Sequence, residues 1–207
     1  MKPSLPLFDH DGRVVSLLGN ADAASIHLLI DQLLRLDTAR RAPITLYVSS
    51  EGGSLMDGLK LMDIVFLLRS PVTAIGMGCI DGAGLILFAT ARQRWLLPSA
   101  VLSTSSLWRL PRMDAAASIG LGPRQNGNVS LVDIATDRIE VTVERRCPEL
   151  SRLILQARDR PAVFAAAESL RLGLADRVLT KRVRSPRLLP SPSRTEPSQP
   201  FSYHAPL

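Results

Sequence analysis

The chain has 207 residues, of which 46% are hydrophobic and 21% charged, so it is long enough for one globular domain with a sizeable core. Its net charge of +6 does not indicate a nucleic-acid binder: residues 182–207 hold four arginines and one glutamate, which give +3 and leave only +3 for the first 181 residues. The two cysteines, Cys79 and Cys147, lie in no metal-ligand spacing. They predict neither a disulfide framework nor a metal site, and they favour a reducing compartment.

Strands and helices are predicted to alternate along most of the chain. Short runs rich in apolar and β-branched residues predict strands at 13–19, 44–50, 71–77, 94–98, 100–104 and 177–180. Runs with apolar residues at helical spacing predict helices at 21–39, 55–70, 83–93, 149–157 and 164–172. This alternation predicts an α/β fold, in which sites tend to form where strands lead into helices.

The two ends and one internal stretch do not fit that pattern. Residues 1–12 form a short segment without the apolar core of a signal peptide, and the Pro/Ser/Arg-rich residues 181–207 predict a disordered tail. A long connection at 109–128 leads into a helical segment that starts at about 129 and is interrupted at Pro148.

The apolar stretch 71–91 is not predicted to cross a membrane. Its central Asp81 would cost about 2.5–3.5 kcal/mol on insertion, and four glycines interrupt the run. A buried strand, turn and helix is the better interpretation. We therefore expect a cytoplasmic protein with neither a membrane nor a nucleic acid as its partner.

Four stretches, in this order, resemble the proteolytic subunit of the ATP-dependent Clp protease. They are "RVVSLLGNADAASIHLLIDQLLRLD", "ITLYVSSEGGSLMDGLKLMDIV", "VTAIGMGCIDGAGLILFATA" and "ESLRLGLADRV". The resemblance covers about residues 13–180. It implies a Clp protease/crotonase-like fold, a superhelix of repeated ββα units, with a handle projecting at about 129–157.

The resemblance also implies a serine peptidase with a Ser-His-Asp triad, and this chain departs from the triad at every position. Gly82 stands at the position of the serine, Thr104 at that of the histidine, and Pro161 at that of the aspartate, where the segment reads "DRP". No histidine lies between His27 and His204 to replace the base. We therefore expect no catalytic residues, although the family itself is one of enzymes.

The resemblance implies that one part of the site is retained. This is the pair of backbone N–H groups, at Gly53 and Ala83, that would bind an oxyanion. Glu51 replaces the family's proline beside this pair, and its carboxylate would oppose the charge to be stabilised. The glycines of the turn also have a purely structural explanation, because they allow positive φ. We interpret Asp81 as the N-cap of the following helix rather than as a recruited catalytic group.

The function predicted is a structural or regulatory subunit of a Clp-type ring. The implied partners are active Clp proteolytic subunits in a homo- or hetero-oligomeric ring, with a AAA+ chaperone as a further candidate, and no cofactor or metal is expected. The alternative is a crotonase-like acyl-CoA enzyme that uses the N–H pair, with Glu51 or Asp81 as acid or base. A Ser-Lys dyad ranks third, because Lys60 lies within a helix after the Gly-Gly turn and does not match a dyad base.

Overall fold

The computed structural model describes residues 12–106, 137, 140–141, 143–145, 147–157 and 160–180. Its strands are β1 (Val14–Leu18), β2 (Ile44–Glu51), β3 (Val72–Asp81), β4 (Gln93–Leu96), β5 (Val101–Ser103), β6 (Val163–Ala165) and β7 (Arg177–Val178). Its helices are α1 (Ala23–Ala39), α2 (Leu55–Leu67), α3 (Ala83–Thr90), α6 (Pro148–Gln156) and α7 (Ala166–Arg171). The predicted tail, the segment 1–11 and the first part of the predicted handle, 129–136, lie outside the described residues, so those predictions stay predictions.

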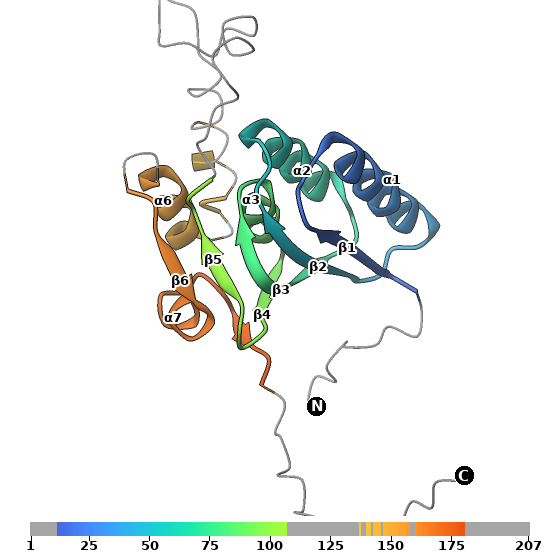
Figure 1. Ribbon diagram of the computed structural model, residues 1–207. Coiled ribbons are helices and arrows are strands. Elements are labelled where there is room, and N and C mark those ends of the chain that lie inside the picture. The colour runs from blue at the N-terminus through green and yellow to red at the C-terminus, as the bar shows by residue number, and fades with distance from the viewer. Residues whose placement is uncertain are drawn as a thin grey trace, which may run out of the picture.

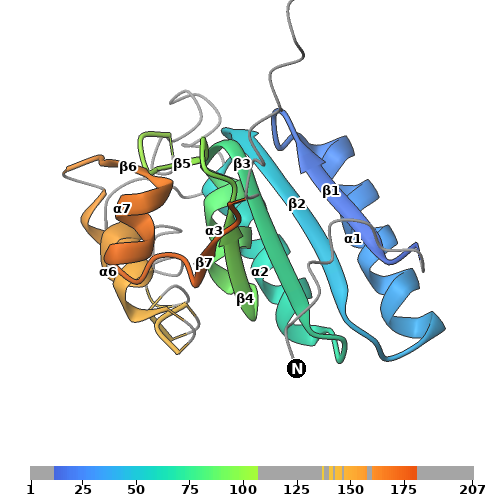
Figure 2. The ribbon, with the colours of Figure 1, turned by 90° about the horizontal axis from the view of Figure 1, so that it is seen from below.

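The strands form one seven-stranded sheet, and its main path is parallel in the order β1-β2-β3-β4-β7 (Figure 1, Figure 2). Strand β3 pairs with β2 and is long enough to pair with two further strands. Its first half pairs with β4, and its last residues pair with β5. The short β6 then adds to β5 in the antiparallel direction. The predicted α/β class with a parallel sheet is confirmed.

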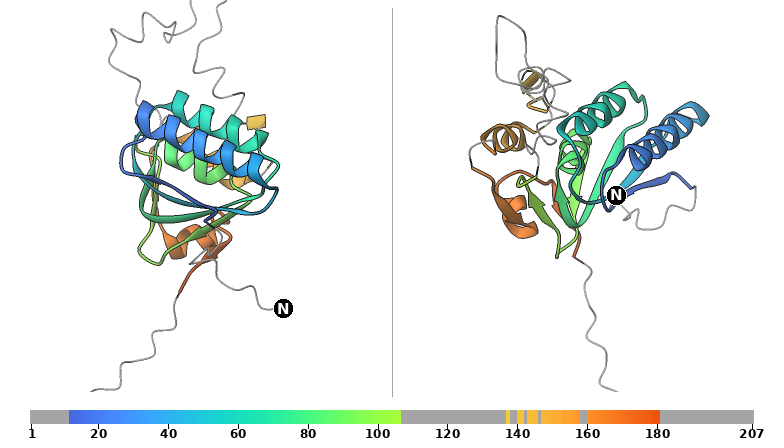
Figure 3. Two further views of the ribbon diagram at one scale, coloured as in Figure 1. Left: turned by 90° about the vertical axis from the view of Figure 1, so that its right-hand side faces the viewer. Right: turned by 45° about the horizontal axis from the view of Figure 1, so that its top comes forward.

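Helices α1, α2 and α3 cover one face of the sheet (Figure 1, Figure 3). In α1 the apolar stripe predicted from the sequence faces the core, with Ile26, Leu29 and Leu33 all buried. Its first turn is closed by a capping box in which Asp22 accepts the N–H of Ser25 at 2.8 Å. Every residue of α3 is buried, which explains why its sequence is apolar on all sides.

A smaller apolar cluster contains Ile75, Trp95 and Leu179, with Tyr47 and Leu97 packed against it. It joins β2, β3 and β4 to the segment that follows β7. The guanidinium of Arg177 lies 5.7 Å from the centre of the Trp95 ring, a distance at which a cation is attracted to an aromatic face.

The C-terminal elements differ from the prediction in one place. Residues 163–165 form strand β6, and the helix α7 that follows is correspondingly shorter than the helix predicted over 164–172. The break predicted at Pro148 is confirmed: α6 begins at this residue, as suits a residue without an N–H at the first helical position. Leu150 and Ile154 of α6 lie in the main core.

The membrane prediction is tested only on part of the chain. Within the described ranges, every helix is too short or too polar to span a bilayer. The apolar stretch 71–91 forms β3 and α3 there.

Candidate functional site

The predicted site residues gather where β2, β3 and β5 end. The turn at Gly52 and Gly53 follows β2, Gly82 follows β3, and Thr104 follows β5. Because β2 and β5 both run parallel to β3, their carboxyl ends reach the same edge of the sheet. We call the place where these strand ends meet the cleft.

The Gly82 position leaves no room for a side chain. Its backbone has φ 56° and ψ −132°, a conformation that side chains of L-residues rarely adopt. A Cβ placed there would lie 2.7 Å from the carbonyl carbon of Gly52 and 2.9 Å from its oxygen. The Ser50 hydroxyl, which is fully buried, donates to that same oxygen at 2.9 Å. The turn after β2 therefore packs directly on the residue where a nucleophile is expected.

Gly53 also needs to be glycine for a structural reason. Its φ is 116°, and a Cβ would lie 2.7 Å from the Cβ of Ala21 and 2.8 Å from the Cβ of Ala83. Gly53 therefore lies beside Ala83, and the predicted oxyanion-binding role of their N–H groups stays a prediction. Neither backbone N–H has a hydrogen-bond acceptor within the described residues. As the first residue of α3, Ala83 belongs to the turn whose N–H groups lack helical partners.

The interpretation of Asp81 as a helix N-cap is wrong. Strand β3 extends through Asp81, the N-cap is Gly82, and no side chain caps α3. The Asp81 carboxylate is 5% exposed and bonds across the strand ends instead: it accepts the N–H of Gly82 at 2.7 Å and the hydroxyl of Ser103 at 2.8 Å. The N–H of Ser106 approaches both carboxylate oxygens, at 3.2 and 3.1 Å.

Thr104, predicted from the sequence to stand at the position of the family histidine, is bound to the chain beside Pro161. Its N–H donates to the carbonyl of Ala162 at 3.0 Å, and its hydroxyl accepts the N–H of Ala162 at 2.9 Å. Thr104 is buried and Pro161 is exposed. The threonine hydroxyl is therefore engaged with backbone, and neither residue carries a group that takes up a proton.

No replacement base approaches the cleft among the residues that the structure describes. His27, the one histidine of that part of the chain, is exposed on α1. Lys60 lies on α2 and donates to Asp57 at 2.9 Å. The Ser103 hydroxyl does meet the carboxylate of Asp81, whose other partners within the described residues are the backbone N–H groups of Gly82 and Ser106, so no imidazole or amine completes a triad around it.

Cys79 is the thiol nearest in sequence to the cleft, and its environment does not activate it. Its burial, together with the negative charges of Asp81 and Glu51, raises the pKa of the Cys79 thiol above its ordinary value. Since the thiolate is the reactive form, this shift lowers its nucleophilicity at neutral pH. Glu51 itself is exposed at the end of β2 and pairs in register with Asp81. The two carboxylates thus disfavour a further negative charge on the Cys79 sulfur.

The family of the chain follows from a comparison over most of its length. The family model described as Clp protease matches residues 9–182. The chain belongs to the Clp protease family. This places it among the proteolytic subunits of Clp proteases, and the folded core described above lies within the matched range.

Individual Clp relatives support the same assignment. The chain is 30% identical over 179 residues to the ATP-dependent Clp protease proteolytic subunit 3 of Streptomyces coelicolor, covering 82% of this chain and 76% of that one. It is 25% identical over 180 residues to the ATP-dependent Clp protease proteolytic subunit of Leuconostoc citreum, covering 84% and 86%.

Solved Clp structures share the fold. ClpP1 from Listeria monocytogenes superposes with a TM-score of 0.63 at 20% identity, covering 82% of this chain and 92% of that one. The catalytic domain of the ClpP protease from Plasmodium falciparum gives a TM-score of 0.63 at 20% identity, covering 86% and 90%.

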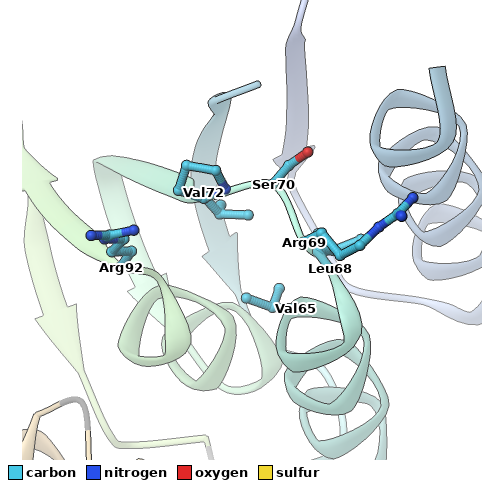
Figure 4. Close-up of a pocket in the computed structure, with 7 residues that line it drawn as sticks. Val65, Leu68, Arg69, Ser70, Val72 and Arg92 are labelled. Carbon is cyan, nitrogen blue, oxygen red and sulfur yellow. The ribbon is translucent and has the colours of Figure 1, made fainter. Parts of the chain in front are cut away.

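A hollow of about 120 Å³ lies at the other edge of the sheet, between the end of α2 and the start of β3 (Figure 4). Arg69 and Arg92 both line it, but the Arg69 side chain extends toward α1, where its Nε lies 3.6 Å from Asp37. The two cations therefore do not converge on one anion. Within the described ranges, no three His, Cys, Asp or Glu side chains gather as a metal site requires.

Proposed function

We propose that this Clp-family chain is a subunit without peptidase activity, and that it acts as a structural or regulatory member of a Clp-type ATP-dependent ring. The observation that carries the proposal is the contact between Gly82 and Gly52. It supports the proposal because the position assigned to the nucleophile has neither a reactive group nor space for one: a Cβ would lie 2.7 Å from a backbone carbon atom.

The other two triad positions point the same way. Thr104 is bonded to Ala162, and Pro161 offers no carboxylate to orient a base. Removing the nucleophile or the base of a serine protease lowers kcat by about 10⁶, which corresponds to about 8 kcal/mol of barrier. The N–H groups of Gly53 and Ala83 alone do not compensate for such a loss.

A role in an assembly is supported by the identity of the relatives. The two sequence relatives described above are named proteolytic subunits of an ATP-dependent protease. We propose that this chain joins a homo- or hetero-oligomeric ring with active Clp subunits, in the cytoplasm, and that a AAA+ chaperone is a candidate partner of the ring. The acyl-CoA alternative gains no support from these relatives.

The test combines activity with assembly. The purified chain is expected to leave a fluorogenic peptide uncut and to remain unlabelled by a serine-directed fluorophosphonate, whereas a Clp subunit with an intact triad reacts in both assays. Co-expressed with such a subunit, it is expected to co-elute in one large complex, and native mass spectrometry gives the copy number of each chain.

Two results would contradict the proposal, each in a different part. The first is stoichiometric labelling of one serine in the purified chain, with the label lost in Ser103→Ala. This would show an active centre that uses the Ser103 hydroxyl instead of one at position 82. Elution as a monomer in the presence of every active subunit of the same genome would exclude the role in a ring. The Ser106→Ala variant is the matched control for the labelling, because Ser106 also lies beside the cleft and its hydroxyl makes no hydrogen bond in the described part of the chain.

A further inference from the structure

The carboxylate of Asp81 joins the start of α3, which follows it directly in the chain, to the segment 103–106 at the end of β5. It accepts from the N–H of Gly82 at the start of α3, from the hydroxyl of Ser103 at the end of β5, and from the N–H of Ser106 beyond β5. These three donors surround a side chain that is only 5% exposed. A buried carboxylate is tolerated when donors of this kind satisfy it, so the bonds and the burial depend on each other.

The network continues from Ser103 along the chain. The N–H of Ser105 donates to the Ser103 oxygen at 3.2 Å, and the two hydroxyl oxygens lie 3.1 Å apart. Ser103 has a single hydroxyl hydrogen, which it gives to Asp81, so Ser105 is the donor in the hydroxyl contact. Thr104, between them, is held to Ala162. One connected set of bonds thus runs from α3 through β5 to the segment before β6.

The backbone pairing between β3 and β5 ends just before this place. Strand β5 has three residues, and its register with β3 comprises only Cys79 with Val101 and Ile80 with Leu102. The bonds from Asp81 begin at the next position, where regular pairing stops. A side-chain bridge at that point does what further ladder bonds would do in a longer strand.

We propose that Asp81 is a clamp that ties the end of β3 and the start of α3 to residues 103–106 beyond β5. The proposal deepens the proposed function and rests on it: in a chain without a Ser-His-Asp triad, the clamp supplies the connection between strand ends that triad side chains otherwise make. It assigns Asp81 a conformational role and no proton transfer. Its effect is to hold Gly82 against the turn at Gly52.

The test is the amide exchange of three N–H groups whose acceptors are side chains of the clamp. In Asp81→Ala, the amides of Gly82 and Ser106 lose their acceptor, and NMR-detected hydrogen exchange of both is expected to accelerate at least tenfold. Ser103→Ala keeps the charge of Asp81 and removes the acceptor of the Ser105 amide. In this variant, exchange is expected to accelerate more at Ser105 than at Gly82 or Ser106. Amides in the middle of α1 report global unfolding and are expected to change less than threefold.

The matched control is Asp37→Ala, at a position remote in sequence. Asp37 is also a buried carboxylate, at 9% exposure, and it accepts the N–H of Ser70 at 2.7 Å. This variant is expected to release the Ser70 amide and to leave Gly82 and Ser106 protected. If Asp81→Ala does not fold, Asp81→Asn retains one acceptor oxygen and is expected to release one of the two amides.

Two outcomes would overturn the clamp. One is unchanged exchange at Gly82 and Ser106 in a folded Asp81→Ala. The other is an equal acceleration at these amides in Asp81→Ala and Asp37→Ala, which would mean that Asp81 contributes only to global stability. Neither result depends on peptidase activity or ring assembly, so failure of the clamp and failure of the proposed function are distinguishable.

Discussion

Adding one methyl group at Gly82 tests the close contact between Gly82 and Gly52 most directly. In Gly82→Ala the new Cβ meets the Gly52 backbone at 2.7 Å, and the buried Ser50 hydroxyl holds the Gly52 carbonyl in place. The unfavourable backbone conformation, with φ 56°, costs about 1–3 kcal/mol. Overpacking against rigid neighbours adds about 1–3 kcal/mol. The expected loss in unfolding free energy is therefore about 2–6 kcal/mol.

Gly19→Ala separates these two contributions. Gly19 also has a positive φ, 82°, but apart from its chain neighbours no heavy atom lies within 4 Å of the place that an alanine Cβ would take, so alanine there meets only the backbone cost. Urea unfolding followed by circular dichroism is expected to show Gly82→Ala less stable than Gly19→Ala by about 1–3 kcal/mol. For a chain of this size each kcal/mol corresponds to about 2–4 °C in Tm. Equal losses in the two variants would refute the argument that Gly52 fills the nucleophile position.

Two further predictions concern carboxylates at the opposite edge of the sheet from the cleft. Asp176 accepts both the N–H and a guanidinium nitrogen of Arg94, at 2.6 and 2.7 Å, so Asp176→Ala is expected to lower the unfolding free energy by about 1–2 kcal/mol in urea titrations, and no measurable loss would contradict it. Burial opposes ionisation of Asp37, but bonds from Ser70 and the charge of Arg69 outweigh it and hold the pKa of Asp37 below its ordinary value. This stabilisation is fully present above about pH 4 and is lost as pH falls through the lower folded pKa, so unfolding curves of Asp37→Asn are expected to depend less on pH in that acidic range, and identical slopes would contradict the assignment.

Helix α1 illustrates where sequence reasoning is sufficient. Apolar residues recur at helical spacing from Ile26 onward, and Ile26, Leu29 and Leu33 face the core as predicted, whereas Leu34 is exposed. The pattern is local, because a helix repeats every 3.6 residues whatever it packs against. The positive φ of Gly53 follows on equally local grounds, since a tight Gly-Gly turn commonly requires it.

Strand β6 shows where local reasoning fails. The alanine-rich sequence around residues 164–172 has helical propensity, which predicts a helix over the whole of it. Residues 163–165 are instead extended, because they pair with the open edge of β5. Such pairing joins segments about 60 residues apart, and no local pattern reports it.

The amino-acid sequence by itself determined the alternating α/β order, the resemblance over residues 13–180, and the absence of a serine, histidine and aspartate from the three positions where that resemblance expects them. Only the tertiary structure decided which contacts the residues around those positions make. The contact of Gly52 with Gly82, and the bonds that Asp81 makes to Ser103 and Ser106, join strand ends that are distant in the chain. Local patterns record the period of a helix or strand, whereas the distance between two loops depends on how the whole sheet is assembled.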